Sequence, residues 1–141
     1  MKKLIACLLA GVCTAAVAGL EFKNIPENLQ KPLQGNALTQ AQMDEQGVLR
    51  LHMGKPVISE LEYTNFIFQG LCAEQWRNPQ RFASWAITKV ELLNEQGQQG
   101  YAFDARGDVC EELGHSGQAG QNYRKKITER TVTCQQGRCG Q

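Results

Sequence analysis

The sequence has little of what the common catalytic and metal-binding motifs require. It has only two histidines, His52 and His115, and its six cysteines never occur as Cys-x-x-Cys. That spacing is usual in redox-active cysteine pairs, and structural zinc needs close cysteine pairs or a Cys2His2 pattern. The chain also lacks a Gly-x-Ser-x-Gly sequence and a glycine loop followed by Lys-Ser or Lys-Thr. We therefore expect no metal and no cofactor, and the weight shifts from catalysis toward binding.

A large excess of one charge is also missing. The formal net charge is +1, and loss of Lys2 and Lys3 with an N-terminal signal would change it to −1. A nearly neutral protein has no global electrostatic reason to bind the phosphates of nucleic acid. We therefore expect no nucleic-acid partner.

The first 18 residues have the pattern of a secretory signal peptide. Two lysines follow Met1, a short apolar stretch runs from Leu4 to Val17, and Ala16 and Ala18 are the small residues that a signal peptidase reads. The alternatives are an uncleaved anchor, for which the stretch is short of the roughly 20 residues of a membrane span, and lipid attachment at Cys13, for which Val12 is the wrong preceding residue. We expect cleavage after Ala18, a periplasmic or secreted protein, and no stable membrane insertion after cleavage.

Four cysteines remain after the signal peptide: Cys72, Cys110, Cys134 and Cys139. An even number in an exported chain predicts two disulfides, with three possible connectivities. The short, glycine-containing segment between Cys134 and Cys139 favours a bridge across the end of a hairpin. Cys72 and Cys110 would then close a long loop.

Turn and periodicity signals predict a single α+β domain over residues 48–141, preceded by an extended or partly ordered arm over residues 19–47. The arm is rich in Gln and Asn, with a short helix considered at Thr39–Glu45. We expect a small antiparallel sheet of about four strands with one packed amphipathic helix, closed by two disulfides. The expected strands are Val48–Met53, Ser84–Leu93, Gly100–Phe103 and Tyr123–Cys134.

The expected helix runs from about Glu60 to Trp76. Ser59 and Glu62 form a capping-box pattern at its start, apolar residues then recur at helical spacing, and Asn78-Pro79 would stop it. The aromatic run Phe66–Phe68 is the competing strand signal.

The segment from Phe82 to Phe103 holds the densest run of β-branched and aliphatic residues and is expected to build the core as a β-hairpin. A turn at Asn94–Gly97, followed by Gly100, separates its two strands. A helix is the rival, because Asn78-Pro79 would make a good N-cap and N1 pair and several apolar residues fall near one helical face.

Two stretches near the C-terminus are candidate contact surfaces. Residues 111–122 form a glycine-rich polar segment, expected to be a loop, with Glu111, Glu112 and His115 as its ionisable groups. The C-terminal end is basic, and we expect Arg124, Lys125, Lys126 and Arg130 either to touch a partner or to protect an exposed edge strand from unwanted pairing.

These features together predict an exported, disulfide-stabilised binding or accessory protein with a protein partner in the bacterial cell envelope. Inhibitors and immunity proteins belong to this class. The alternatives are a small envelope hydrolase that uses Glu111, Glu112 or His115 for acid-base chemistry, and a small-molecule carrier with an apolar pocket near Trp76 and Trp85. Enzyme activity is the less favoured reading.

Overall fold

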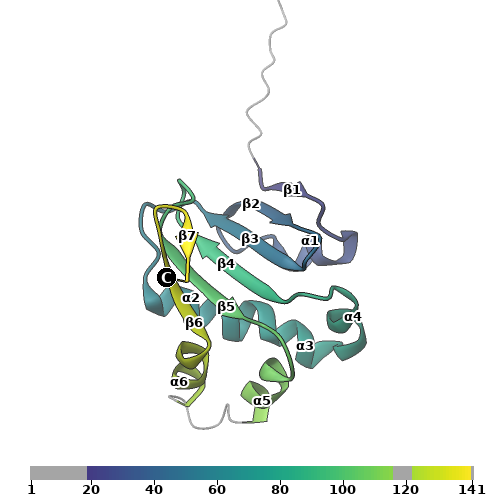
Figure 1. Cartoon of the computed structure of the whole chain (residues 1–141). Coiled ribbons are helices and arrows are strands. Elements are labelled where there is room, and N and C mark those ends of the chain that lie inside the picture. The colour runs from purple at the N-terminus through teal and green to yellow at the C-terminus, as the bar shows by residue number, and fades with distance from the viewer. Residues whose placement is uncertain (1–18, 116–121, 141) are drawn as a thin grey trace, which may run out of the picture.

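A seven-stranded sheet organises the part of the chain that the computed structural model describes, residues 19–115 and 122–140 (Figure 1). The strands lie side by side in chain order: β1 (Glu21–Lys23), β2 (Leu38–Met43), β3 (Val48–Met53), β4 (Lys89–Leu93), β5 (Gly100–Asp104), β6 (Thr131–Gln135) and β7 (Arg138–Cys139). β1 runs parallel to β2 and β3 parallel to β4, whereas the other neighbouring pairs are antiparallel. The α+β class is confirmed, but the sheet is mixed and larger than the small antiparallel sheet that we expected.

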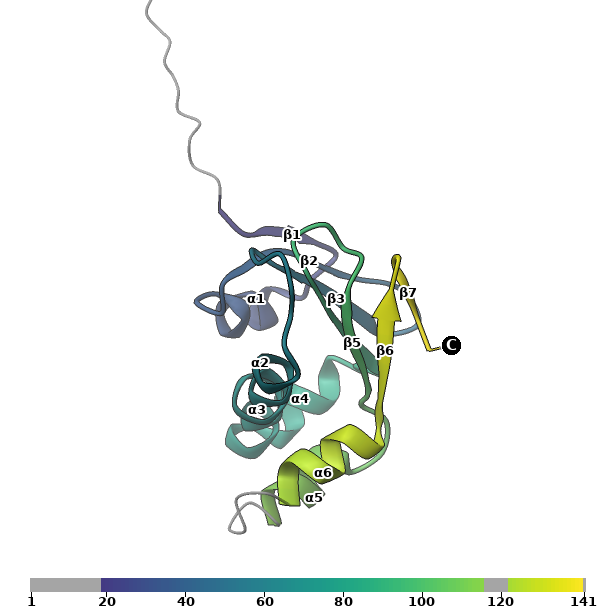
Figure 2. The same ribbon diagram turned by 90° about the vertical axis from the view of Figure 1, so that its left-hand side faces the viewer.

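Helices form the connections that the two parallel pairs need, because a parallel pair cannot be joined by a tight turn. α1 (Glu27–Leu33) connects β1 to β2. The connection from β3 to β4 consists of α2 (Glu60–Asn65), the π-helical segment η2 (Phe66–Cys72), α3 (Ala73–Arg77) and α4 (Pro79–Ser84). Figure 2 shows these helices together on one side of the sheet. The single packed helix of the sequence prediction is therefore replaced by a helical layer.

The helix predicted from Glu60 to Trp76 is confirmed as the continuous stretch formed by α2, η2 and α3. Its start has the predicted capping box: Ser59 Oγ accepts a hydrogen bond from the backbone N–H of Glu62, and the Glu62 carboxylate accepts one from the backbone N–H of Ser59. The stretch ends at Asn78, whose side chain caps the next helix.

Residues of alternating strand positions and one helical face build the core between the sheet and the helices. Leu49, Leu51, Val90, Leu92 and Phe103 come from the central strands and are fully buried. The helices and the final helix–strand unit contribute Leu29, Tyr63, Ile67, Leu113 and Ile127. The period-2 pattern of β3 thus predicts its buried face correctly.

The predicted strand Ser84–Leu93 is wrong over its first half. Asn78 and Pro79 act as the N-cap and N1 pair of α4, which includes Ser84, and the strand begins only at Lys89. Ala86 has a left-handed backbone (φ 53°) and ends the helical turn. The hairpin of β4 and β5, with its turn after Leu93, is confirmed.

The predicted strand Tyr123–Cys134 is also wrong in its first half. Residues Asn122–Glu129 form helix α6, which buries Ile127, and only Thr131–Gln135 form strand β6. The predicted polar loop begins with another helix, α5 (Val109–His115), and the rest of it, residues 116–121, lies outside the described residues. β7, not β6, is the last strand of the sheet.

The segment expected to be an extended or partly ordered arm, residues 19–47, contributes β1, α1 and β2. The short helix considered at Thr39–Glu45 is wrong, because β2 occupies Leu38–Met43 and pairs with β3. The predicted signal peptide, residues 1–18, lies outside the described residues.

Both disulfides form with the preferred connectivity. Cys72–Cys110 joins η2 to α5 across 38 residues of sequence. Cys134–Cys139 links β6 to β7 across a two-residue turn in which Gln136 and Gly137 have φ values of 55° and 80°. Positive φ at both central residues is typical of the type I′ hairpin turn, and the glycine supplies it without strain. The glycine-containing hairpin end predicted from the sequence is therefore confirmed.

Candidate functional site

The face of the sheet that points away from the helices carries the candidate site. Because side chains alternate along a strand, the neighbours of the core residues on β3, β4 and β5 lie on this uncovered face. They are Val48, Arg50 and His52 on β3, Lys89, Glu91 and Leu93 on β4, and Ala102 and Asp104 on β5. The strand register aligns Arg50, Glu91 and Ala102 in one row across the sheet and Val48, Lys89 and Asp104 in the next. The charged side chains in the centre of this face therefore lie on the neighbouring strands β3, β4 and β5, close enough to pair with one another.

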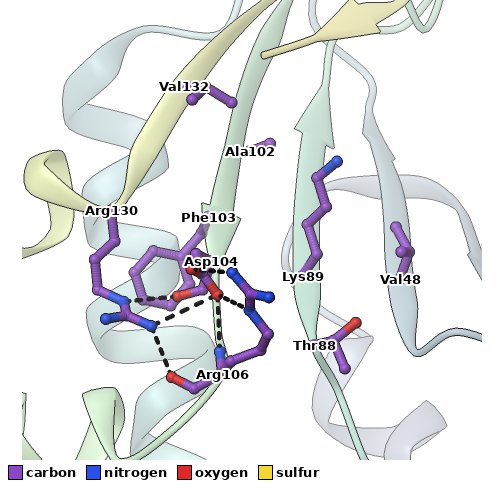
Figure 3. Close-up of a pocket in the computed structure, with 9 residues that line it drawn as sticks. All are labelled: Val48, Thr88, Lys89, Ala102, Phe103, Asp104, Arg106, Arg130 and Val132. Carbon is purple, nitrogen blue, oxygen red and sulfur yellow. Dashed lines mark hydrogen bonds and ion pairs between the residues drawn. The ribbon is translucent and has the colours of Figure 1, made fainter.

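A pocket of about 520 Å³ opens at one end of this face (Figure 3). Its apolar lining includes Ala102 and two valines from the flanking strands, Val48 and Val132. Val132 leaves 43% of its surface exposed, which is unusual for a valine in a sheet. Lys89, Arg106 and Arg130 supply the cationic part of the lining. The volume is in the range typical of ligand pockets, and we name this feature the sheet-face pocket.

Asp104 is the carboxylate of the sheet-face pocket, and two arginines share it. Nε and Nη2 of Arg106 donate to the two carboxylate oxygens at 2.9 Å each, and Nη2 of Arg130 lies 3.5 Å from Oδ1. The guanidinium of Arg130 also donates to the backbone oxygens of Asp104 and Arg106. The hydrogen bonds from the Arg106 side chain hold the pKa of Asp104 well below its ordinary value, and Asp104 in turn raises the pKa of Arg106.

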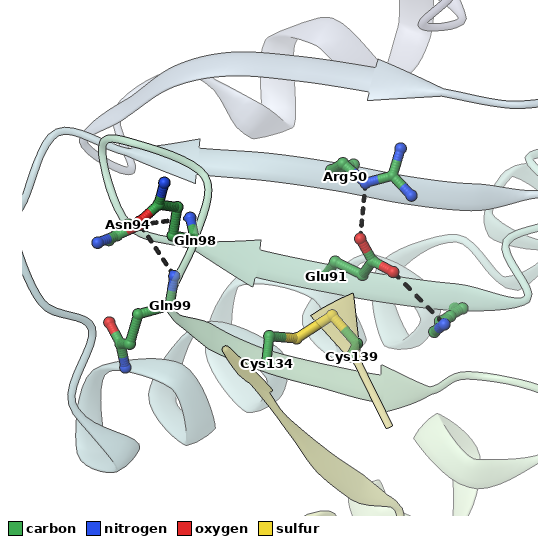
Figure 4. Close-up of a disulfide and its surroundings, with 8 residues drawn as sticks. Arg50, Glu91, Asn94, Gln98, Gln99, Cys134 and Cys139 are labelled. Carbon is green, nitrogen blue, oxygen red and sulfur yellow. Dashed lines mark hydrogen bonds and ion pairs between the residues drawn. A yellow bond between two sulfur atoms is a disulfide. The ribbon is translucent and has the colours of Figure 1, made fainter. Parts of the chain in front are cut away.

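Glu91 repeats this arrangement one strand away. Its carboxylate is 2.6 Å from Nε of Arg50 and 3.4 Å from Nζ of Lys89, and its side chain is only 8% exposed (Figure 4). A buried carboxylate is costly unless it is paired, and here each oxygen faces a cation. Each of the two carboxylates is therefore shared by two cations. The four cations Arg50, Lys89, Arg106 and Arg130 exceed their carboxylate partners by two positive charges.

The turn and the disulfide beside this face are held by their own interactions. Asn94, which is buried, accepts hydrogen bonds from the backbone N–H groups of Gln98 and Gln99 and donates to the backbone oxygen of Pro56 (Figure 4). Leu93, Ala102 and Cys134 form a small separate core against which Cys139 packs. Leu93 and Ala102 are therefore buried on this face, next to the hairpin that carries the Cys134–Cys139 disulfide.

The contact residues predicted from sequence do not gather at one place. Arg130 lines the sheet-face pocket, whereas Arg124, Lys125 and Lys126 lie on α6 and Glu111, Glu112 and His115 on α5. Lys89, Asp104 and Arg106 line the pocket as well, and none of them was predicted from the sequence as a site residue. The sequence does contain a signal for an exposed polar face, because polar residues alternate with the core residues of β3 and β4. The strand order, which the sequence does not reveal, places these polar residues beside β5 and β6.

The candidate acid-base residues have a separate location. Glu111 and His115 are one helical turn apart on α5, and both line a hollow of about 490 Å³ together with Phe68 and Trp76. The indole N–H of Trp76 donates to the backbone oxygen of Cys110 at 2.7 Å, which fixes the ring. Within residues 19–115 and 122–140, no three His, Cys, Asp or Glu side chains come close enough to hold a metal ion.

The surroundings of Trp85 give no support to a pocket shared by the two tryptophans. Trp85 is 5% exposed, its indole N–H donates to Asn28, and its ring packs edge-on against Phe82. Trp76 instead lies against Phe68, which stacks on Tyr123. A carrier site at the tryptophans would therefore be limited to the hollow beside Trp76.

The disulfides also bear on where the protein resides. Structural disulfides persist in oxidising compartments and are rare in the cytosol, so the two bridges indicate a non-cytoplasmic location. In the described part of the chain, none of the helices has the length and apolar character that crossing a membrane requires. No protein-family model, curated protein or solved structure matches the chain.

Proposed function

We propose that this chain is an exported binding protein of the bacterial cell envelope that holds a protein partner on the uncovered face of its sheet. Inhibitors and immunity proteins act in this way. The observation that carries the proposal is the sheet-face pocket, in which exposed apolar surface lies beside cations that outnumber their carboxylate partners. An apolar centre with a polar and charged surround is a common composition of protein interfaces.

Affinity capture with oxidised residues 19–141 as bait tests the proposal. We expect an envelope protein to be retained by the wild-type bait and then to bind it directly when both are purified. Binding should be lost when Lys89→Gln is combined with Val132→Ser. Both side chains are about 40% exposed, so this variant should stay folded.

The matched control changes the other basic surface. Lys125→Gln with Lys126→Gln on α6 alters the charge by two units without touching the sheet-face pocket. Retention of the partner by the control and its loss from the pocket variant would support the proposal. Wild-type binding by both variants would remove the uncovered face from the proposal. Loss only from the α6 variant would move the contact to α6, whose basic residues the sequence analysis proposed as partner contacts.

A second candidate function is a small envelope hydrolase at the hollow beside Trp76. It is favoured by one observation, the placement of Glu111 and His115 one turn apart along the same hollow. The triple alanine variant of Glu111, Glu112 and His115 should then lose hydrolysis of an envelope substrate while keeping the wild-type melting temperature. Full activity of that variant would eliminate this candidate.

A further inference from the structure

The charges of the sheet-face pocket are unbalanced in a way that specifies the chemistry of its occupant. The Asp104 carboxylate accepts two hydrogen bonds from the side chain of Arg106 and forms a longer ion pair with Arg130. Within the described residues, the side-chain hydrogen bonds of both arginines come from Nε and Nη2 and none from Nη1, and Figure 3 shows both guanidinium groups at the pocket. A guanidinium donates best to a carboxylate or a phosphate. The occupant that completes this site is therefore an anion.

The apolar lining narrows the choice of anion. Val132 and Val48 face the same pocket as the arginines, so an occupant that fills it also buries aliphatic surface; Ala102 lines the pocket beside Val132 but is already buried. A free inorganic anion would leave the valines in water. An acidic side chain next to an aliphatic one in a peptide satisfies both parts of the pocket, and the volume of about 520 Å³ suits a few side chains.

Cations are disfavoured as occupants for a direct reason. The carboxylate oxygens of Asp104 already accept from Arg106, and the other charged groups in the pocket are Lys89 and Arg130. A metal ion or a basic peptide would have to displace Arg106 and face uncompensated positive charge. Charge complementarity therefore selects an acidic partner surface.

We propose that the partner anchors to this protein by an acidic segment, with a glutamate or aspartate carboxylate bound by Arg106 and Arg130 and a neighbouring aliphatic side chain packed on Val132 and Ala102. This inference rests on the proposed function, because it describes the partner contact at the same face. It makes the two arginines the specificity residues of the pocket and the exposed valine the apolar anchor point.

The test uses a defined peptide rather than an unknown partner. The probe is the acetylated and amidated peptide Gly-Leu-Glu-Leu-Gly, titrated into the isotope-labelled oxidised protein and followed by amide and arginine Nε–H resonances. We expect saturable shifts confined to β5, the start of β6 and the side chains of Arg106 and Arg130. Replacing the glutamate of the peptide by glutamine should weaken binding at least tenfold, which is about 1.4 kcal/mol.

Four controls test which groups of the pocket and of the peptide carry the binding. Arg106→Gln with Arg130→Gln should abolish the shifts, and Lys125→Gln with Lys126→Gln should leave them unchanged. The single variant Arg106→Gln, whose side chain is 73% exposed, keeps the test valid if the double variant does not fold. The peptide Gly-Ala-Glu-Ala-Gly should bind more weakly than the leucine peptide.

Three results would overturn the inference. Equal binding of the glutamate and glutamine peptides would show that the carboxylate does not contribute to recognition. Inorganic phosphate that produces the same shifts as the leucine peptide, with no dependence on the leucines, would reduce the pocket to an anion site. If the peptide binds but no partner is captured, the peptide site stands and the proposed function fails. If a captured partner contacts the face through a segment without acidic residues, the proposed function stands and this inference fails.

Discussion

The ionised carboxylate of Asp104 contributes to the stability of the folded protein through its pairs with Arg106 and Arg130. Hydrogen bonds from Arg106 lower its pKa below the ordinary value of 3.8, so the folded state binds this proton only at lower pH than the unfolded chain does. A depressed carboxyl pKa contributes stability above the unfolded value, and the contribution is lost as the pH falls toward the folded pKa. The ion pairs of Asp104 thus support the fold at neutral pH and weaken below about pH 4.

We expect Asp104→Asn to unfold at lower urea concentration than the wild type at about pH 7 and by a smaller margin near pH 2. The difference should begin to shrink below about pH 4, since the unfolded wild-type chain then takes up a proton at Asp104 and the ionised folded form loses part of its advantage. Glu129→Gln is the control, because this exposed carboxylate pairs with Lys125 one helical turn away on α6, and the loss of such an exposed ion pair should change stability little. A pH-independent difference for Asp104→Asn would contradict the argument.

Gly114 is a second single residue on which packing depends. A Cβ at this position would lie 2.7 Å from Nε1 of Trp76, the nitrogen that donates to Cys110. Alanine is favoured over glycine in a helix by about 1 kcal/mol. Overpacking typically costs about 1–3 kcal/mol, and the indole is held in place by its hydrogen bond, so the clash should prevail.

We therefore predict that Gly114→Ala lowers the free energy of unfolding and changes the near-ultraviolet circular dichroism and emission of tryptophan. Gly19→Ala is a matched control, because nothing lies within 4 Å of a Cβ built there. A stabilised Gly114→Ala protein with an unchanged tryptophan spectrum would show that the indole yields freely.

The unit of α6 and β6 shows what helical packing contributes at the level of elements. Ile127 is fully buried in α6 and joins the main core, although the residues around it are polar or basic. Ile127→Ala should cost about 2–5 kcal/mol, as expected for truncation of a core aliphatic residue. Val57→Ala is the control, since Val57 is 63% exposed and should change stability by less than about 0.5 kcal/mol.

The elements that the sequence predicts well are those whose local signals agree. The capping box at Ser59 and the helical spacing that follows it both indicate one helix, and the alternation in Val48–Met53 indicates one strand. The prediction failed in the stretch before Lys89, where a strand-like composition was preferred to a helix start signal. The apolar residues before Lys89 suit a strand, but Asn78 and Pro79 start a helix there. Ala86 ends that helix by adopting a left-handed backbone conformation, which glycine usually provides.

The prediction of a strand from Tyr123 to Cys134 failed for a different reason. Its threonines and valine suggest a strand, yet the charged first half has ordinary helix formers, and Tyr123 and Ile127 are spaced by four residues. The change from helix to strand at Arg130 has no glycine or proline to mark it. At this position the side chain of Arg130 instead donates hydrogen bonds to the backbone oxygens of Asp104 and Arg106, which are distant in sequence.

At the scale of the whole molecule, the two disulfides restrict the unfolded chain to different extents. The chain-entropy model gives roughly 4 kcal/mol for a loop like that of Cys72–Cys110 and roughly 2 kcal/mol for one like that of Cys134–Cys139. We expect Cys72→Ala with Cys110→Ala to lower the urea midpoint more than Cys134→Ala with Cys139→Ala. The reverse order would mean that local packing around the C-terminal hairpin outweighs chain entropy.

The pocket could be predicted only in part because its residues come from elements far apart in the chain. Val48, Lys89, Asp104 and Arg130 belong to four different segments, and local periodicity does not say which strands become neighbours. The basic character of the C-terminal end drew attention to Arg130, which does line the pocket. The parallel pairing of β3 with β4, which aligns Val48 with Lys89, has no sequence signal of its own.

The surplus of positive charge on the uncovered face has a consequence for how the protein meets copies of itself. A sheet covered on one side only presents a flat surface on which a second sheet can stack, but two such faces would bring eight cations together over four carboxylates. Like charges at that range repel unless salt screens them beyond about 10 Å. We expect sedimentation to show a monomer in dilute salt and face-to-face pairs once Lys89 and Arg106 are replaced by glutamine. The positive charge that we propose as the attraction for an acidic partner would then also keep the surface free of other copies of the chain.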